Sequence, residues 1–416
     1  MTLPASNPLR VAIVVSHPTQ YYAPWFRHIA STGELALKVY YLWDFGVQDR
    51  FDPDFGRSLA WDIPLLDGYD WEFVPNVSAD PGTTRFGGLD NPDLNMRLAA
   101  DKPDAIILFG YAYKAHMLLL LSSRLRHVPI FLRGDSHDIA RESGLRQRVA
   151  RLLRRMLFRR LAGALAVGSA NRSYFLTAGM PPDNIHIVPH CVDNARFSAA
   201  ANRADVDASA LRAEWGVPQD AVLVMFAGKF EDKKRPLDLL EAFCALEQDP
   251  AVVAARPVLV LVGDGAHARH LRARAGERLG KSVVIVPFQN QSRMPTVYAA
   301  ADLLVLPSYG NGETWGLVIN EAMNLGVPCL VSSHVGGGHD LVRSGETGWC
   351  FPAGDGCALV ATLREAITCG PGQRRRLGDA ARRNVQAHFS FEVASAALVR
   401  AVESAAGRAR HEGVGA

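Results

Sequence analysis

VLVLVGDG, residues 258–265, is a continuous run of apolar residues that ends in a glycine turn. A strand that is apolar at every position must be covered on both of its faces, as the central strands of a parallel sheet are. A strand with one face in solvent would alternate apolar and polar residues instead. The stretch therefore predicts a parallel sheet with helices packed on both sides.

Similar runs, rich in Val, Ile and Leu, recur along the whole chain and are separated by segments with helical spacing. The first half holds residues 11–16, 35–43, 105–110, 129–134, 163–169 and 185–189, and the second half holds residues 221–228, 282–288, 303–308, 329–333 and 348–352. We therefore expect an α/β protein with two doubly wound parallel-sheet domains. Their ligand should lie at the carboxyl ends of the strands, in a cleft between the domains.

The polar, alanine-rich stretch 198–216 carries no strand signal, and we expect a linker there. This places an N-terminal domain at residues 1–203 and a C-terminal domain at residues 204–390. A C-terminal helix and tail should follow at residues 391–416.

Composition excludes several other classes of protein. The 416 residues are too many for a single core, and the net charge of +3 is too small to indicate a nucleic-acid partner. The six cysteines form no CxxC pair, which argues against a zinc site or a disulfide framework. The first apolar run is too short for a signal peptide, and the leucine-rich run at residues 117–121 is far below the about 20 residues that span a bilayer. We expect a soluble, cytoplasmic protein that is at most peripheral to a membrane.

GETWGLVINEAMNLGVP, residues 312–328, carries the clearest functional pattern. Glu313 precedes a helix that begins near Gly316, and Glu321 lies one to two turns inside this helix. Paired acid and base catalysts would have to reach one bond, so this spacing favours two clamps on different parts of one extended ligand. The N–H groups of the first helical turn suit an anion or sugar hydroxyls. The alternative is a capping charge at Glu313 and a solvated helix residue at Glu321.

Basic residues follow the first strand of the second half. FAGKFEDKKRPLDLLEAF, residues 226–243, places Lys229 after the strand and Lys233, Lys234 and Arg235 before a helix. Such cations can reach a phosphate across a cleft, although a solvated run of charges is the alternative. The glycine turn GGGH, residues 336–339, also follows a strand, and it would either admit a ligand close to the backbone or form a flexible turn.

These motifs resemble those of the large nucleotide-sugar glycosyltransferase family four, which has an E-x7-E motif, and in particular its bacterial surface-polysaccharide type. The string PS-x4-E-x2-GL-x3-EAM-x2-G-x-P runs from Pro307 to Pro328, and GKFEDKKRPLDLLEAF resembles the family's GR-x4-KG-x-DLL-x-AF element. The resemblance covers most of residues 160–355. It implies the GT-B fold, in which two Rossmann-like domains face each other across a cleft. It also implies a retaining transfer of sugar from a nucleoside diphosphate to a hydroxyl, with no cofactor.

The resemblance also implies roles for individual residues. Lys229 and Lys234 would bind the donor diphosphate, Glu321 the ribose hydroxyls and Glu313 the transferring sugar. The remaining predicted donor contacts are Gly228, the backbone amides of Thr314, Trp315, Gly316 and Leu317, and Phe288 and Gln289 near the base. Lys229 stands where Arg is usual, and Asp340 stands where a longer acidic residue is usual. The DPD (52–54) and DVD (205–207) strings follow no strand end, so we expect no metal site.

The N-terminal half resembles the family less closely. Its first loop, residues 16–29, has His17 and Gln20 where glycines are usual. His137, in LRGDSHDIA (132–140), occupies a loop where members of the family often carry a His that touches the transferring sugar. We predict that His137 acts with Glu313 and Lys234 as a catalytic residue. His17, Arg133 and Asp135 are predicted on the acceptor side, and a structural role is the alternative for each.

Residues 141–163 contain eight arginines and an apolar stripe at helical spacing. A basic amphipathic helix can bind anionic lipid, and the alternative is a packed helix with a solvated face. Enzymes that this chain resembles often use lipid-linked acceptors at the inner membrane face. The predicted partners are therefore a nucleotide-sugar donor, a glycan or lipid-linked acceptor and an anionic membrane surface, without nucleic acid.

Two rival functions remain open at this point. One is a nucleotide-sugar epimerase or phosphorylase on the same scaffold. The other is a non-catalytic binding module, which should have lost a Glu or Lys of the motifs, and none is lost here. The sequence does not fix the base, the sugar or the acceptor.

Overall fold

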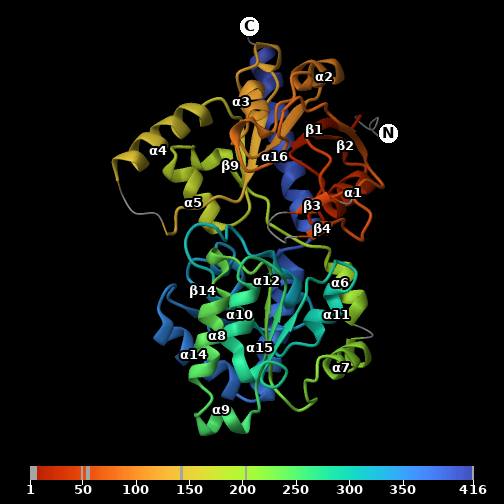
Figure 1. The fold of residues 1–416 in the computed structure, drawn as a ribbon. Coiled ribbons are helices and arrows are strands. Elements are labelled where there is room, and N and C mark those ends of the chain that lie inside the picture. The colour runs from red at the N-terminus through yellow and green to blue at the C-terminus, as the bar shows by residue number, and fades with distance from the viewer. Residues whose placement is uncertain (1–6, 48–49, 53–56, 141–143, 202–203, 415–416) are drawn as a thin grey trace.

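The computed structural model describes residues 7–47, 50–52, 57–140, 144–201 and 204–414. Two α/β domains lie one above the other (Figure 1). The N-terminal domain holds a seven-stranded sheet of order β5-β2-β1-β6-β7-β8-β9, and the C-terminal domain holds a six-stranded sheet of order β12-β11-β10-β13-β14-β15. All neighbouring strands in both sheets are parallel. The predicted fold class is confirmed.

The strands of the first sheet are β1 (Leu9–Val15), β2 (Leu35–Tyr41), β5 (Asp70–Phe73), β6 (Ala105–Phe109), β7 (Ile130–Gly134), β8 (Gly163–Ala166) and β9 (Ile185–Ile187). Those of the second are β10 (Leu223–Ala227), β11 (Val258–Val262), β12 (Val283–Val286), β13 (Leu303–Leu306), β14 (Cys329–Ser332) and β15 (Gly348–Phe351). Each of the apolar runs named above overlaps one of these strands. The sequence pattern missed β5 and a small antiparallel hairpin, β3 (Arg50–Asp52) with β4 (Arg57–Leu59).

The helices of the N-terminal domain are α1 (Tyr22–Thr32), α2 (Leu94–Asp101), α3 (Lys114–Leu120), α4 (Leu145–Phe158) and α5 (Ser169–Thr177). They are followed by α6 (Asn194–Ala201), α7 (Ala204–Glu214), α8 (Pro236–Ala245), α9 (Pro250–Ala254), α10 (Ala268–Ala275), α11 (Met294–Ala299), α12 (Leu317–Asn324), α13 (Gly338–Leu341), α14 (Gly356–Thr368), α15 (Pro371–His388) and α16 (Phe391–Val414). Within the described parts of the chain, no helix is long and apolar enough to cross a bilayer.

Strand β11 shows why its sequence is apolar at every position. Leu259 and Leu261 belong to the core on one face of the sheet, and Val258, Val260 and Val262 belong to the core on the other face. Side chains of a strand alternate between faces, so two covered faces require an unbroken apolar run. The N-terminal sheet is enclosed in the same way by two cores.

The predicted linker at residues 198–216 is wrong. The described part of this stretch is helical in α6 and α7, and residues 202–203 lie outside the described residues. Phe197, Ala208 and Leu211 are buried in the core of the C-terminal domain, together with Val192. The chain thus enters the second domain before the predicted boundary, because alanine-rich segments with a few buried apolar residues form helices without any strand signal.

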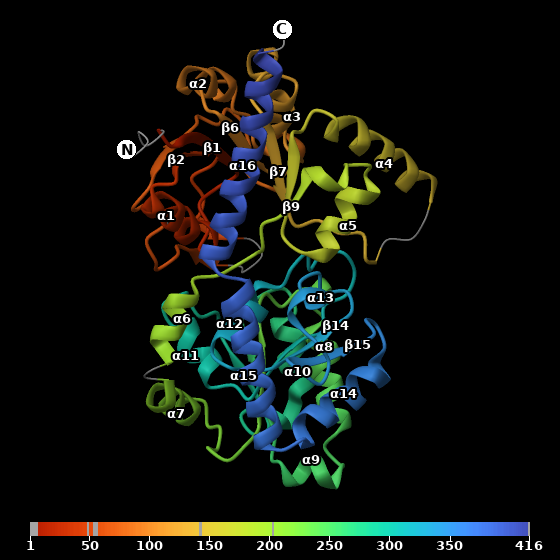
Figure 2. The same cartoon turned by 180° about the vertical axis from the view of Figure 1, so that it is seen from behind.

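The C-terminal helix α16 returns to the N-terminal domain. Phe391, Leu398 and Val402 are buried in the core beneath α1, and the indole Nε1 of Trp25 donates a hydrogen bond to Ser395 Oγ at 3.1 Å. Figure 2 shows α15 on the lower domain and α16 continuing up the back of the upper domain. The predicted helix is therefore an integral part of the first domain.

Candidate functional site

A cavity of about 110 Å³ lies between the two domains. The C-terminal domain contributes Ala227, Gly228, Val262, Gly263, Phe288, Gln289, Gln291, Met294, Tyr298, Val318 and Glu321, and the N-terminal domain contributes Gln20, Tyr21 and Trp61. Gly228 and Gly263 follow the carboxyl ends of β10 and β11, where doubly wound sheets bind ligands.

Glu321 brings a buried carboxyl group to this cavity. It lies on α12 with 1% of its surface exposed, and its Oε2 accepts a hydrogen bond from the Tyr298 hydroxyl at 2.6 Å. Its Oε1 has no hydrogen-bond partner among the described residues. Burial raises the pKa of Glu321 to about 7, although the bond from Tyr298 and the charge of Arg196 oppose this shift. A buried acceptor without a partner costs free energy, so a hydroxyl donor in the cavity would be bound here.

Glu313 lies before α12 in a different environment. It is 8% exposed, and its Oε2 accepts hydrogen bonds from Lys234 Nζ at 2.5 Å and from Ser308 Oγ at 3.1 Å. The cation predicted for the phosphate and the carboxylate predicted for the sugar are therefore paired in this structure. Gly228 adjoins the Lys234 stem, and the half-buried Lys229 follows it directly. The two carboxylates have separate partners, and their roles as two clamps on one ligand stay a prediction.

The loop between Glu313 and α12 is held in place by backbone contacts. The N–H groups of Gly336 and Gly337 donate to the carbonyl oxygens of Glu313 and Trp315 at 3.1 and 2.8 Å. A Cβ at Gly336 would overlap the carbonyl oxygen of Thr314, so glycine is required there. The GGGH turn thus packs closely against this loop, and the approach of a ligand to its backbone stays a prediction.

The predicted amide donors come at the start of α12. Gly316, with φ of +90°, precedes Leu317, the first residue of the helix. The first N–H groups of a helix have no partner within it and carry its positive dipole end. Trp315 is buried, and its indole Nε1 donates to Asn320 Oδ1 at 2.8 Å, so its side chain anchors this turn from below.

His137 and Asp135 reach the same loop from the N-terminal domain. His137 Nδ1 accepts from the Ile139 N–H at 3.3 Å, so Nε2 carries the proton and donates to the Glu313 carbonyl oxygen at 3.2 Å. Burial lowers the pKa of His137, which favours this neutral form. Asp135 Oδ2 accepts from Thr314 Oγ1 at 2.6 Å. The structure thus brings both residues to Glu313, where they join the two domains.

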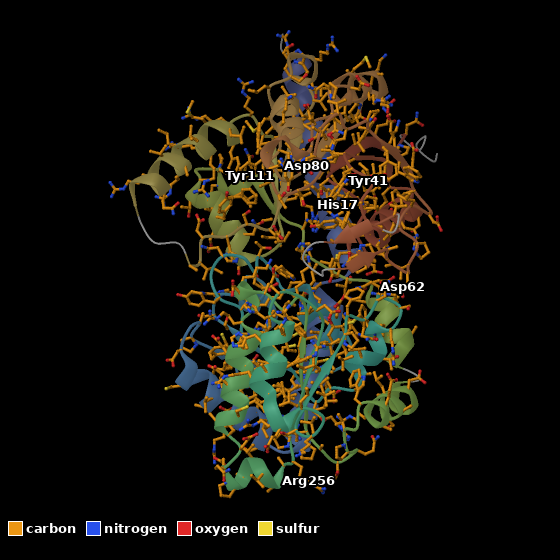
Figure 3. The ribbon with its side chains drawn as sticks, in the orientation of Figure 1. His17, Tyr41, Asp62, Asp80, Tyr111 and Arg256 are labelled. Atoms are coloured by element: carbon orange, nitrogen blue, oxygen red, sulfur yellow. The ribbon has the colours of Figure 1, made fainter. Side chains whose placement is uncertain are left out.

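Arg133 and His17 lie elsewhere. Arg133 is 1% exposed, donates to the Val188 carbonyl oxygen at 2.9 Å and lies over the Trp25 ring at 4.6 Å. The predicted acceptor contact of Arg133 is therefore not available in this structure, because its guanidinium is enclosed by the first domain. His17, labelled in Figure 3, packs edge-on against Trp43 and does not line the cavity described above. Its acceptor-side role stays a prediction.

Several residues of the site carried no sequence signal. Tyr298 holds Glu321 from another helix, and Trp61 reaches the cavity from the first domain. Asp340, expected to replace the family's acidic residue near the donor, accepts instead from the N–H and Oγ of Ser169 at the start of α5, each at 3.0 Å. These contacts join residues far apart in the chain, so no local motif could have indicated them.

No metal-binding group of three His, Cys, Asp or Glu side chains is found among the described residues. The absence of a metal in function stays a prediction, and residues 53–54 of the DPD string lie outside the described ranges.

The architecture has close counterparts among solved structures. HepE from Anabaena, crystallised with UDP and glucose, superposes with a TM-score of 0.69 at 20% identity, covering 95% of this chain and 100% of HepE. WaaG, a glycosyltransferase involved in lipopolysaccharide biosynthesis, gives a TM-score of 0.64 at 17% identity, covering 93% and 98%. At such identities the likeness defines the fold, which is GT-B.

Two family models match the chain. "Glycosyl transferase 4-like domain" matches residues 68–191, and "Glycosyl transferases group 1" matches residues 207–384. The chain therefore belongs to the family-four type of glycosyltransferases.

Curated relatives agree with this assignment. The D-inositol 3-phosphate glycosyltransferases of Streptomyces bingchenggensis and Streptomyces coelicolor are 33% and 34% identical over 225 and 194 residues, or 53% and 45% of this chain. These alignments cover 47% and 41% of the two relatives, so the chain spans about half the length of the curated relatives it matches.

Proposed function

We propose that this protein transfers a sugar from a nucleoside diphosphate to a hydroxyl of a glycan or lipid-linked acceptor, with retention of the anomeric configuration. We place this reaction in the synthesis of a polysaccharide or other glycoconjugate. The observation that carries the proposal is the interdomain cavity, with the open oxygen of Glu321 beside glycine backbone and the Lys234–Glu313 pair nearby. The binding of UDP by HepE, a neighbour in fold, supports a uridine nucleotide as the first donor to test.

The residues divide the donor among them. Ribose hydroxyls donate to Glu321 Oε1, and the diphosphate lies near Gly228, Lys229 and Lys234, at the start of α12. Lysine ammonium groups are point charges, so they neutralise the diphosphate without the paired geometry of an arginine. When the diphosphate takes Lys234 as its counter-ion, the carboxylate of Glu313 is released from its ion pair. It then accepts hydrogen bonds from hydroxyl groups of the transferring sugar.

Charge develops on the diphosphate as the sugar becomes oxocarbenium-like. Preorganised cations and helix N–H groups stabilise this charge, and each such group contributes roughly 2–4 kcal/mol in comparable sites. We propose a displacement on one face of the sugar. The acceptor oxygen bonds to the anomeric carbon as the bond to phosphate breaks, and the acceptor proton passes to the leaving phosphate oxygen.

The first experiment compares UDP, GDP and ADP as ligands by calorimetry, followed by incubation with the matching sugar nucleotides. We expect one nucleotide to bind preferentially and its sugar nucleotide to be hydrolysed slowly, with release of sugar, when no acceptor is present. Release of an epimerised free sugar would support the rival epimerase. Binding without any turnover in the presence of a range of acceptors would support a non-catalytic module.

The exposed apolar and basic side chains of α4 support a proposal of membrane attachment. Val149, Leu152, Leu153 and Met156 are 51%, 59%, 61% and 59% exposed, which is unusual for four apolar side chains on one helix. The exposed arginines at 148, 151 and 155 lie on the same helix, and the exposed Arg159 directly follows its last residue. α4 projects from the edge of the upper domain (Figure 1). The first residues of the predicted basic segment, 141–143, lie outside the described residues.

We propose that this face of α4 inserts shallowly into an anionic membrane, where apolar burial and the attraction of arginines to lipid headgroups add together. The test is co-flotation with vesicles of neutral lipid or of neutral lipid with anionic lipid, at low and at physiological salt. Retention should require anionic lipid and should be lost in Leu152→Ser/Met156→Ser. The matched control is Leu118→Ser, because Leu118 on α3 is 44% exposed and lies outside α4. No retention on anionic vesicles at low salt would contradict the proposal.

A further inference from the structure

We infer that Trp61 of the N-terminal domain forms the nucleobase end of the donor site, with the base packing on its indole. This inference rests on the proposed function, and it adds a residue that lies outside every motif of the sequence. The consequence is that the base of the donor contacts both domains, while its ribose contacts the C-terminal domain.

The first observation is the attachment of the segment 60–62 to the C-terminal domain. The Ala60 carbonyl oxygen accepts from Asn290 Nδ2 at 2.8 Å, and the Asp62 N–H donates to Asn290 Oδ1 at 3.4 Å. Asp62 also accepts from the N–H of Ser292 at 3.0 Å and from the hydroxyl of Ser292. Figure 3 labels Asp62 where the upper and lower domains meet. The segment therefore bridges the domains on both sides of Trp61.

The second observation is the support behind the indole. The backbone N–H of Trp61 donates to the Gly46 carbonyl oxygen at 3.4 Å. A Cβ at Gly46 would lie 3.2 Å from both Cδ1 and Nε1 of the indole, and Gly46 has φ of +88°. A side chain at position 46 would therefore displace the indole, and its absence lets the ring rest against the backbone of the first domain.

The third observation is the chemistry of this end of the cavity. Trp61 and Phe288 both line it, with ring centroids 6.2 Å apart and planes tilted by 57°, and Gln289 adjoins them. Glu321, which takes the ribose in the proposed function, lines the same cavity. An aromatic face with a neighbouring amide suits a nucleobase, since every base offers a π-face for stacking and polar edges for hydrogen bonds. A phosphate has no such face.

The alternative is that Trp61 only packs in the domain interface. The two possibilities differ in which ligands they affect. If Trp61 stacks on the base, its loss weakens the binding of nucleotides but not of pyrophosphate, because pyrophosphate would occupy only the lysine end of the site. Loss of interface packing would weaken the binding of both ligands together.

The experiment measures the Kd of UDP and of inorganic pyrophosphate by calorimetry for the wild type, Trp61→Ala and Trp61→Phe. Trp61→Ala should weaken UDP by about 5- to 150-fold, the range found when aromatic residues that stack on bases are replaced by alanine, and should leave pyrophosphate within twofold. Trp61→Phe should retain most of the UDP affinity. Equal weakening of both ligands, or unchanged UDP binding in Trp61→Ala, would overturn the inference while leaving the proposed function in place. A wild type that binds pyrophosphate but no nucleoside diphosphate would overturn the proposed function as well.

A fluorescence readout tests the contact directly. UDP should quench tryptophan emission in the wild type and in Trp71→Phe, a matched variant on β5, because Trp71 does not line the cavity. In Trp61→Phe, which still binds UDP, the quenching should be lost. Quenching that survives in Trp61→Phe at saturating UDP would show that the base does not contact this indole.

Discussion

Replacing Glu321 with Gln should stabilise the free protein, and only at neutral to alkaline pH. An ordinary Glu carboxyl has a pKa of 4.5, whereas burial raises that of Glu321 to about 7. Between these values the folded protein holds a proton that the unfolded chain has lost. The free energy of unfolding must therefore fall as the pH rises through this window, and the loss is complete above about pH 7. Glutamine keeps the shape, still accepts from the Tyr298 hydroxyl and has no charge to bury.

The magnitude follows from the same two values. Each pKa unit corresponds to 1.36 kcal/mol, so the window from 4.5 to about 7 corresponds to about 3 kcal/mol of stability in the C-terminal domain. The assay is urea-induced unfolding of the wild type and Glu321→Gln at pH 4.5 and pH 8, followed by circular dichroism. The advantage of the glutamine variant should be about 3 kcal/mol larger at pH 8 than at pH 4.5. Glu34→Gln, at an exposed position, serves as the control and should show no such change.

The same carboxyl predicts how binding depends on pH. A ribose hydroxyl that donates to Oε1 favours the ionised form, so binding should release a proton below about pH 7. The affinity for uridine, which has no titrating phosphate, should increase from pH 5.5 to pH 8 in the wild type but not in Glu321→Gln. A stability difference between the two proteins that is the same at pH 4.5 and pH 8 would refute the reasoning, because the carboxyl would then not be buried as described.

Three further predictions concern the rest of the site. Glu313→Gln should lower the rate of transfer by more than about 100-fold, as expected when a group that acts in the transition state is lost. The Kd for UDP, measured by calorimetry, should stay within threefold of the wild-type value. Equal losses in rate and binding would contradict the separate roles. Lys229→Ala and Lys234→Ala should each weaken the binding of UDP and of pyrophosphate by about 10- to 100-fold in calorimetry, as expected for the loss of a hydrogen bond to a charged group. Lys233→Ala serves as the control and should change these affinities little, because its side chain is 44% exposed and paired with Glu231. Asp340→Ala removes the acceptor for Ser169 at the start of α5 and should lower the free energy of unfolding by about 0.5–2 kcal/mol, measured by thermal or urea unfolding. An unchanged midpoint would mean that this contact between domains does not stabilise the protein.

The strands were predictable because a sheet covered on both faces requires unbroken apolar runs. A short run such as VLVLV that ends in a glycine turn is typical of such a strand. The edge strand β5 was missed because DWEF is short and half polar, with no fully buried side chain. The supposed linker escaped for a different reason. Its helices pack through a few residues such as Phe197 and Leu211, and alanine between them gives no amphipathic contrast.

The site was predictable only as far as its motifs extend. Glu313 and Glu321 stand at a spacing that a single loop and helix impose. The structure places Glu321 in the interdomain cavity and pairs Glu313 with Lys234, which comes from the loop before α8. Tyr298, Trp61 and Asp62 come from other elements, and their positions depend on how two domains pack. Arg133 followed a strand end as a ligand-binding residue would, but its guanidinium turned toward carbonyl groups within its own domain. Sequence distance from a strand end does not tell which way a side chain points.

The return of α16 to the first domain has a practical consequence for dividing this protein. A fragment that stops near residue 190 would lack the helix that covers Trp25 and the surface of α1, so apolar side chains would be left in water. Trimming the C-terminus would therefore destabilise the N-terminal domain, because α16 is part of its core. An independently folding first half would have to be made by joining residues 391–414 to it through a new loop.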